Sequence, residues 1–425
     1  MPAKIDRVGE HSIRRKNHKT NGLVRFREQG VQMLTPQTEQ ALCAAFDPQG
    51  KRIALGTETR LLLVEPSGVS RVLYTNPPNI KRIEQVAWNS AGTHLAVGFY
   101  GSPAIVVLEV ASGKPVGSFE SAGSSIYWSP HGEQVAVFRG NLLKCLTLAT
   151  GQVESHTCGS KISSITWNPD SNQLAVGLEK TVAILDSNKL ELIAELPVER
   201  TTQVASLPPG NLLCLGDHEG KLRIWDMLER QPAWEFALPE KISVGEMCWS
   251  PQANLIAVND QVRWWIYDLQ QRQFVGKPEA SPAFAWSPDG KRMLTSEAIM
   301  ERATGEKTPH AMTLHTLAWR PDGTYVGLTP TEPNDDQTGP LLVKEGDPHL
   351  ISLIPNPQGV ISQFDAAGHL LGGTVPEMDG YFVYYAELED GSYRVFTPSE
   401  FHAQFMALAA QSPTPTVAEP ATPKQ

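Results

Sequence analysis

The sequence lacks long hydrophobic runs and paired cysteines. No stretch approaches the roughly 18 uninterrupted apolar residues of a membrane-spanning helix, so we expect no membrane association. No apolar segment follows the basic N-terminal stretch, which argues against a secretory signal. The five cysteines are dispersed and never form a C-x-x-C pair. This pattern favours reduced thiols in a cytoplasmic protein over a disulfide framework or a zinc site.

Motifs of the common catalytic and cofactor sites are also absent. The chain has no G-x-S-x-G nucleophile turn, no P-loop, no dinucleotide-binding glycine pattern and no H-E-x-x-H motif. Asp217, His218 and Glu219 are adjacent, but their position suits a hairpin turn better than an acid–base site. His310 and His315 are expected at the surface, on opposite faces of a strand. The sequence therefore predicts no catalytic residue, no metal site, no cofactor and no enzymatic activity.

Charge is sparse and mildly acidic. Charged residues make up 19% of the 425 residues, and the formal net charge is −10, which argues against a general nucleic-acid binder. The chain has instead 34 glycines and 33 prolines spread along its length, as well as ten tryptophans. Evenly spread turn-forming residues are typical of many short strands.

One sequence phrase recurs along the chain. It consists of a short apolar segment, an aromatic anchor, a turn rich in Ser, Asn, Pro and Gly, and a second apolar segment, as in VAWNSAGTHLAVG, ITWNPDSNQLAVG and FAWSPDGKRML. Nine units can be aligned in this way, and Ser206 replaces the aromatic residue in unit five. The anchors of the other units are Phe46, Trp88, Trp128, Trp167, Trp249, Trp286, Trp319 and Phe364.

The spacing of the anchors predicts four short strands in each unit. Successive anchor positions are separated by 42, 40, 39, 39, 43, 37, 33 and 45 residues. A period near forty residues is typical of four-stranded repeats and is too long for leucine-rich repeats. The turn residues between the apolar segments favour antiparallel hairpins, and the anchor aromatics are expected to fill the layers between neighbouring units.

The repeats resemble those of WD40-repeat β-propellers. The strongest match is LGDHEGKLRIWD in unit five, where Trp225–Asp226 occupies the signature dipeptide; Tyr267–Asp268 occupies it in unit six. The resemblance implies an all-β fold, a single propeller of eight or nine four-stranded antiparallel blades. The alternative is seven blades with an appended two-unit piece, because nine units exceed the usual number of blades.

The domain organisation follows from the limits of the repeat. Residues 41–402 are predicted to form the propeller, and residues 403–425 a disordered Pro/Thr-rich tail. Residues 1–40 are predicted to form a basic arm and a ring-closing strand, the latter within residues 22–34 and paired with the last blade.

The N-terminal arm is basic, whereas the last units are acidic. Residues 1–28 carry a local net charge of +5, and residues 330–400 carry −10. The arm either lies against these acidic units, binds an anionic partner such as RNA or an acidic protein, or serves as a localisation signal. The candidate partner-binding residues of the arm are Arg14, Arg15, Lys16 and Lys19.

A second basic group is predicted on the loops that lead into the first strand of several units. Equivalent positions of different blades lie around the same rim, so these residues would form a partial basic arc that binds an acidic segment or a phosphate. The alternative is ordinary solvated charge. The candidate residues are Lys81, Arg82, Lys161, Arg200 and Lys241.

Two adjacent tryptophans, Trp264 and Trp265, must face opposite sides of a strand. We expect both to pack in the core, and the alternative is that one is exposed as an anchor for a partner.

The repeat and the missing motifs together favour a non-catalytic scaffold or adaptor that binds one or more proteins in a cytoplasmic complex. One alternative is an RNA- or ribosome-associated protein that uses the basic arm. Another is a propeller enzyme with a site in its central channel.

Overall fold

The computed structural model describes most of the chain between residues 41 and 328 and several separate strands outside it. The described ranges are 30–33, 41–65, 70–80, 82–102, 104–120, 125–170, 172–198, 201–207, 212–252, 254–260, 262–281, 284–310, 316–328, 341–344, 351–355, 361–364, 370–372, 382–387 and 393–396. All regular elements within these ranges are β-strands.

Seven four-stranded antiparallel sheets follow one another along the chain. Sheet one contains β2 (Ala41–Phe46), β3 (Ile53–Thr57), β4 (Arg60–Val64) and β5 (Ser70–Thr75). Sheet two contains β6 (Ile83–Trp88), β7 (His94–Phe99), β8 (Ile105–Glu109) and β9 (Pro115–Phe119). Sheet three contains β10 (Ile126–Trp128), β11 (Gln134–Arg139), β12 (Leu142–Thr147) and β13 (Gln152–Thr157). Sheet four contains β14 (Ser164–Trp167), β15 (Gln173–Gly177), β16 (Thr181–Asp186) and β17 (Leu192–Pro197).

The next three sheets have the same order of strands. Sheet five contains β18 (Thr201–Leu207), β19 (Leu212–Asp217), β20 (Lys221–Asp226) and β21 (Gln231–Ala237). Sheet six contains β22 (Met247–Trp249), β23 (Leu255–Asn259), β24 (Arg263–Asp268) and β25 (Gln273–Ala280). Sheet seven contains β26 (Phe284–Trp286), β27 (Arg292–Thr295), β28 (Ala298–Glu301) and β29 (Lys307–Pro309). The sequence-based prediction of repeated four-stranded antiparallel units is confirmed for these seven.

The strands after sheet seven are arranged differently. A six-stranded sheet contains β30 (Thr316–Trp319), β31 (Tyr325–Leu328), β32 (Leu341–Lys344), β33 (Ile351–Pro355), β34 (Ile361–Phe364) and β35 (Leu370–Gly372). Units eight and nine therefore share one sheet, because β34 pairs with β33 and places Phe364 opposite Ser352. The prediction of nine separate four-stranded units is wrong for the ninth.

The N-terminal strand pairs with strands near the end of the repeat region. β1 (Gly30–Met33) is hydrogen-bonded antiparallel to β36 (Phe382–Glu387), which also pairs with β37 (Tyr393–Phe396). The strand predicted within residues 22–34 thus pairs with the C-terminal part of the repeat region. The rest of the N-terminal arm and the C-terminal tail lie outside the described residues.

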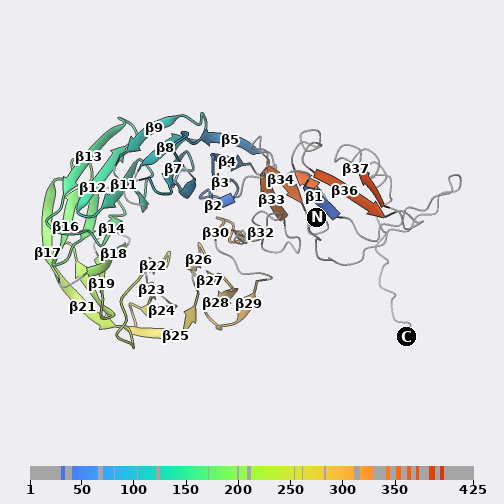
Figure 1. The fold of residues 1–425 in the computed structure, drawn as a ribbon. Coiled ribbons are helices and arrows are strands. Elements are labelled where there is room, and N and C mark those ends of the chain that lie inside the picture. The colour runs from blue at the N-terminus through green and yellow to red at the C-terminus, as the bar shows by residue number, and fades with distance from the viewer. Residues whose placement is uncertain are drawn as a thin grey trace, which may run out of the picture.

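The sheets are arranged radially around an arc (Figure 1). Their fourth strands lie on the outside, and the first strands of neighbouring sheets lie against each other, as β2 and β6 or β14 and β18 do. β30 lies against both β26 of sheet seven and β2 of sheet one. The arrangement is that of propeller blades, because each sheet buries its faces against its neighbours.

The anchor tryptophans fill the layers between sheets, as predicted. Trp167 and Trp286 are each 7% exposed; Trp167 lies in the cluster between sheets three and four, and Trp286 in the cluster between sheets six and seven. Trp88 and Trp128 are half-buried and pack against the clusters between sheets one and two and between sheets two and three. The side chain of Phe364 lies outside the described residues.

The anchor tryptophans also form hydrogen bonds from their indole N–H groups to backbone carbonyls of the preceding sheet. The indole nitrogen of Trp88 donates to the carbonyl of Ala45 at 3.0 Å, one residue before the anchor of the preceding sheet. The same bond recurs at four other junctions: Trp128 to Ala87 (3.0 Å), Trp167 to Tyr127 (3.0 Å), Trp286 to Cys248 (3.2 Å) and Trp319 to Ala285 (3.1 Å). We call this series the indole ladder. At these five junctions the ladder joins the first strands of neighbouring sheets directly.

The indole ladder is interrupted on both sides of sheet five. Sheet five has Ser206 at the anchor position, and its backbone N–H donates to Thr166 of sheet four at 3.3 Å. On the other side, the buried Nε1 of Trp249 in sheet six has no partner. The replacement of one aromatic residue thus coincides with a change in the hydrogen bonds at two junctions.

Candidate functional site

The loops that lead into the first strands lie on the same face as the turns between second and third strands, and we call this the loop face. Arg82, Lys161 and Lys241 lie on these loops, before the first strands of sheets two, four and six, and all three are exposed. The other predicted members of the arc, Lys81 and Arg200, lie outside the described residues. The predicted residues of the arm, Arg14, Arg15, Lys16 and Lys19, also lie outside them.

Arg82 stacks on an exposed aromatic side chain that the sequence did not single out. Its guanidinium carbon lies 4.0 Å from the ring centroid of Tyr100, which is 46% exposed. The backbone N–H of Tyr100 donates to the Arg82 carbonyl at 3.0 Å, so both residues are held at the end of the pair β6–β7. A cation stacked on an aromatic ring keeps its outward N–H groups available for a ligand.

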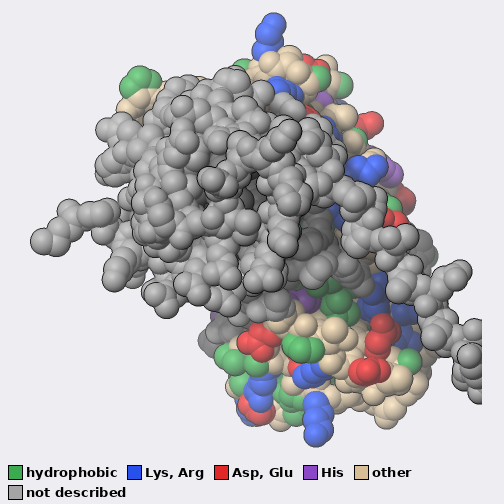
Figure 2. Space-filling model, turned by 90° about the vertical axis from the view of Figure 1, so that its right-hand side faces the viewer, with side chains coloured by type: hydrophobic (Ala, Val, Ile, Leu, Met, Phe, Trp, Pro, Cys, Tyr) green, Lys and Arg blue, Asp and Glu red, His purple; other side chains and the backbone are tan. Residues whose placement is uncertain are grey.

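Acidic residues also lie on the loop face. Glu179 and Glu219 are exposed on the turns of sheets four and five, so the basic arc is interrupted by negative charge. The loop face is therefore mixed in charge, with separate cationic positions. Basic and acidic side chains are also interspersed on the described surface that is visible in Figure 2, which shows the molecule from the right-hand side of Figure 1.

Two acidic residues at the loop-face end of sheet six, Glu240 and Asp260, form ion pairs with one arginine. Arg263 bonds both carboxylate oxygens of Glu240, at 3.2 and 2.8 Å, and also bonds the buried Asp260 at 3.0 Å. The indole of Trp265 donates to the same Asp260 carboxylate at 2.8 Å. Burial alone would raise the pKa of Asp260, but the hydrogen bonds from Trp265 and the backbone, together with the charge of Arg263, lower it overall.

Lys241 is adjacent to this network in sequence but is not part of it. Because Glu240 is already paired with Arg263, its carboxylate is not left to neutralise the lysine. Among the residues that the structure describes, none forms an ion pair with Arg82, Lys161 or Lys241.

The adjacent tryptophans pack on opposite faces of β24, as predicted. Trp264 is 3% exposed, donates to the Ser281 carbonyl at 3.2 Å and stacks on Phe284. Trp265 is half-buried and packs against the cluster between sheets five and six. Both have structural roles.

The other predicted features on this face are turns and bridges between sheets. Asp217 accepts hydrogen bonds from the backbone of Glu219 and Lys221, both at 2.9 Å, which confirms the turn predicted there. The surface position expected for His310 is wrong. Its ring is half-buried between the Thr295 carbonyl and the Tyr325 hydroxyl, at 3.1 Å from each, because it links sheet seven to β31. Burial lowers the pKa of His310. His315 lies outside the described residues.

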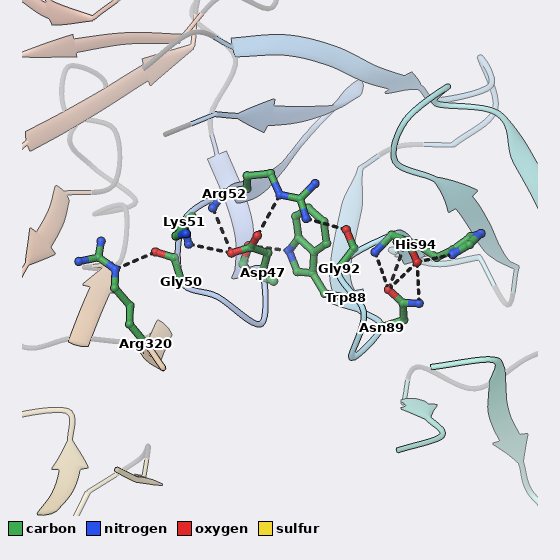
Figure 3. Close-up of polar contacts among 11 residues, drawn as sticks. Asp47, Gly50, Lys51, Arg52, Trp88, Asn89, Gly92, His94 and Arg320 are labelled. Carbon is green, nitrogen blue, oxygen red and sulfur yellow. Dashed lines mark hydrogen bonds and ion pairs between the residues drawn. The ribbon is translucent and has the colours of Figure 1, made fainter. Parts of the chain in front are cut away.

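The opposite end of the sheets carries the turns that follow the anchors, and we call it the turn face. Arg52 of sheet one pairs with Asp47 at 2.9 Å and reaches the Gly92 carbonyl of sheet two at 2.6 Å (Figure 3). Its guanidinium carbon also lies 4.8 Å from the centroid of the Trp88 ring. Arg292 of sheet seven repeats this contact with the next unit, over the ring of Trp319 in β30 and with the Gly323 carbonyl in the turn that follows β30.

The turn-face contacts continue in both directions from Arg52. The side-chain amide of Asn89 in sheet two donates to the Gly132 carbonyl of sheet three at 3.0 Å. Arg320, which follows β30, donates to the Gly50 carbonyl of sheet one at 3.1 Å (Figure 3). Val326 of β31 packs in the cluster formed by Ile53 and its neighbours in sheet one. The eighth unit thus contacts both the seventh and the first.

A groove of about 620 Å³ lies on the turn face, among the turns of sheets two, three and four. It is lined mainly by amide, hydroxyl and imidazole side chains, together with two carboxylates. Sequence analysis did not predict this groove, because its lining comes from turns of three different units.

The described residues offer no metal-binding group of three or more His, Cys, Asp or Glu side chains. Burial raises the pKa of the cysteine thiols, to about 12 for Cys43 and Cys145 and to about 11 for Cys158 and Cys248. Thiols of this kind are weak nucleophiles at neutral pH. Within the described part of the chain, no helix is long and apolar enough to cross a membrane.

One family model matches part of the chain. It is described as the Anaphase-promoting complex subunit 4 WD40 domain, and it matches residues 128–208, from Trp128 of sheet three through β18 of sheet five. No curated protein matches the chain. The matched segment coincides with the repeated four-stranded sheets, as expected for a WD40-like domain.

Proposed function

Because the chain carries a WD40-like domain of repeated four-stranded antiparallel sheets, we propose that it is a protein-interaction scaffold. WD40 domains commonly act in this way and are usually non-catalytic. The proposed binding surface is the loop face, and the proposed partner is an acidic protein segment.

The observation that carries this proposal is the exposed pair of Arg82 and Tyr100. Lys161 and Lys241 lie at equivalent loops of other sheets, and no described acidic group is paired with them. Val262, on a turn of the same face, is 66% exposed. Separate cations beside exposed apolar surface suit a segment that alternates acidic and apolar side chains.

The experiment is affinity capture of the full chain from cells, followed by mass spectrometry and quantification of stoichiometric partners. The test variant carries Arg82→Glu, Lys161→Glu and Lys241→Glu. The matched control makes the same charge change at exposed turn-face lysines, through Lys51→Glu, Lys114→Glu and Lys291→Glu.

We expect a stoichiometric partner that binds the wild type and the control but not the loop-face variant. A partner that is retained by the loop-face variant, or lost from both variants, would contradict the proposed surface. Capture of RNA in place of protein would favour the nucleic-acid alternative.

We also propose that the sheets form one closed ring of eight blades, in which β30–β33 form the eighth. The contacts of Arg320 with Gly50 and of Val326 with the core of sheet one support this proposal. Arg320→Ala should lower the melting temperature, whereas Lys291→Ala, at an exposed turn of sheet seven, should leave it unchanged. Equal melting temperatures for both variants would count against closure through this contact.

A cytoplasmic location is proposed from the cysteines. All five are free in the structure. Thiol labelling of the denatured chain taken directly from cells should modify all five, and a disulfide found by mass spectrometry would contradict this location.

A further inference from the structure

The outer edge of sheet three differs from the outer edges of the other four-stranded sheets. β13 is the fourth strand of this sheet and lies on the outside of the arc (Figure 1). In the described part of the chain, no strand pairs with the outer edge of β13. An open sheet edge presents a row of backbone N–H and C=O groups that is ready to pair with another strand.

The other fourth strands carry features that oppose such pairing. Proline occurs in β9, β17, β21, β25 and β29. A register irregularity interrupts the pairing of β5, β9, β17, β21 and β25 with their neighbours. β13 has neither feature, because it pairs regularly with β12 over all six of its residues, QVESHT. Prolines and bulges are common protections of exposed edges, so the outer edge of β13 is unprotected in this respect.

The backbone hydrogen bonds of sheet three show which groups of β13 point outward. The N–H of Cys158, directly after β13, donates to the Asn141 carbonyl at 2.8 Å and therefore points towards β12. Backbone groups of successive residues in an antiparallel strand point alternately to either side. The N–H and C=O groups of Val153, Ser155 and Thr157 consequently point away from β12.

A second copy of β13 matches this outward row in one antiparallel register. In that register, Ser155 lies opposite Ser155 of the second copy at a two-fold axis, and Val153 lies opposite Thr157. Each of these pairs exchanges two N–H···O=C bonds, because all its backbone groups point outward. The register also places Glu154 opposite His156 on both sides of the axis.

The side chains of Glu154 and His156 favour the same register. Both are half-buried and lie on one face of sheet three, opposite Cys145 and Leu143 of β12. Gln152 of the same strand donates to Glu154 at 2.5 Å, but no basic side chain among the described residues forms an ion pair with Glu154. An imidazole ring carries an N–H donor for a carboxylate whether or not it is charged. A shift by two residues would instead place Glu154 opposite Glu154 or His156 opposite His156, and like charges directly opposite are unfavourable.

We propose that the outer edge of β13 is a self-association surface, through which two copies of the chain pair antiparallel and join their third sheets into one continuous sheet. On the other face of this sheet, Val153, which is 38% exposed, packs beside Thr157 of the second copy as a pair of β-branched side chains. The contact uses neither the loop face nor the turn face, so it is independent of the proposed scaffold surface. Because the strands pair antiparallel, the dimer presents its two loop faces in opposite directions.

The test is sedimentation velocity of the full chain over a dilution series from high-micromolar to sub-micromolar concentration. We expect a reversible equilibrium between monomer and dimer for the wild type. Ser155→Pro removes the outward N–H next to the axis in each copy and no hydrogen bond between β12 and β13. This variant should remain monomeric throughout the series and retain the circular-dichroism spectrum of the wild type.

A second set of variants tests the register. Glu154→Lys should weaken dimerisation by about tenfold, because each dimer loses two carboxylate acceptors. Adding His156→Glu to this variant places a carboxylate opposite each lysine and should restore the dissociation constant to within about threefold of the wild type. The matched control, Glu195→Lys, makes the same charge change at an exposed position of the neighbouring fourth strand, β17, and should change the constant by less than about twofold.

Four results would overturn the proposal. They are a wild type that stays monomeric throughout the series, a dimer that persists in the folded Ser155→Pro variant, equal weakening by Glu154→Lys and Glu195→Lys, and no recovery in the double variant. If Ser155→Pro does not fold, the Glu154 variants and their control decide the question.

Discussion

The indole ladder allows a matched comparison between two tryptophans. Trp128 and Trp249 are both half-buried and both end three-residue first strands, β10 and β22. Trp128 donates to the Ala87 carbonyl at 3.0 Å, whereas the buried Nε1 of Trp249 has no partner. Replacement by phenylalanine removes the indole N–H in both cases, but it removes a hydrogen bond only in the first.

The expected magnitudes follow from these contacts. The phenylalanine ring buries less apolar area than the indole, and this loss lowers the free energy of unfolding by about 1 kcal/mol at either site. Trp128→Phe additionally leaves the Ala87 carbonyl without its indole donor, at about 1–3 kcal/mol. Trp249→Phe removes a buried unpaired donor, so part of its packing loss is offset. We therefore expect Trp128→Phe to destabilise the protein by at least about 1 kcal/mol more than Trp249→Phe.

The assay is urea-induced unfolding of the full chain, followed by circular dichroism in the β-sheet region. The free energies of unfolding of the wild type and the two variants are compared at one pH. Equal destabilisation by the two substitutions, or a larger effect at Trp249, would refute the role assigned to the indole N–H groups.

Two further predictions concern a turn and a carboxylate. Gly113 has a φ of +70°, and a Cβ there would lie 2.6 Å from the Leu73 carbonyl oxygen of sheet one, whereas Gly101, with a φ of +67°, has open space around it. Gly113→Ala should therefore lower the free energy of unfolding more than Gly101→Ala, by about 1 kcal/mol or more in urea titrations. The pKa of Asp260 is lower in the folded protein than in the unfolded chain. The Asp260 carboxylate therefore stabilises the fold fully above the ordinary carboxyl pKa of about 3.9, and this stabilisation is lost as the pH falls through the pKa of the folded state. Asp260→Asn should reduce the change in unfolding midpoint between mildly and strongly acidic solution, and an unchanged pH dependence would contradict the assigned role.

The repeat was predictable from sequence because its signal is local. A tryptophan followed by a Pro- and Gly-rich turn, as at Trp286, marks the end of a first strand whatever the neighbouring units do. The ninth unit shows the limit of this signal. The apolar pattern before Phe364 is that of a first strand, but the same pattern suits a strand added to the preceding sheet, and β34 pairs in that way.

The candidate sites depended on contacts that sequence spacing does not specify. The loop positions of Arg82, Lys161 and Lys241 followed from the repeat. The stacking of Arg82 on Tyr100 depends instead on the register of β6 and β7, which places the two residues opposite each other. The groove was not predicted because its lining comes from neighbouring sheets. Gln134 of sheet three, for example, donates to the Ser187 carbonyl of sheet four, and the sequence of either unit alone does not specify how the two sheets are placed. A single signal was available for the turn-face contacts. An arginine occurs six residues after the anchor in units one and seven.

The indole ladder bears on how the number of repeats can change during evolution. Each unit of the ladder carries its own donor, the anchor indole, and its own acceptor, the carbonyl one residue earlier, as Trp128 and Tyr127 do. A tandem duplication of one such unit would therefore create a junction whose donor and acceptor are already matched. A copy of unit five, which has Ser206 in place of the indole, would add a junction without this bond. The anchor residue of a unit thus determines whether its duplication adds an indole hydrogen bond at the new junction.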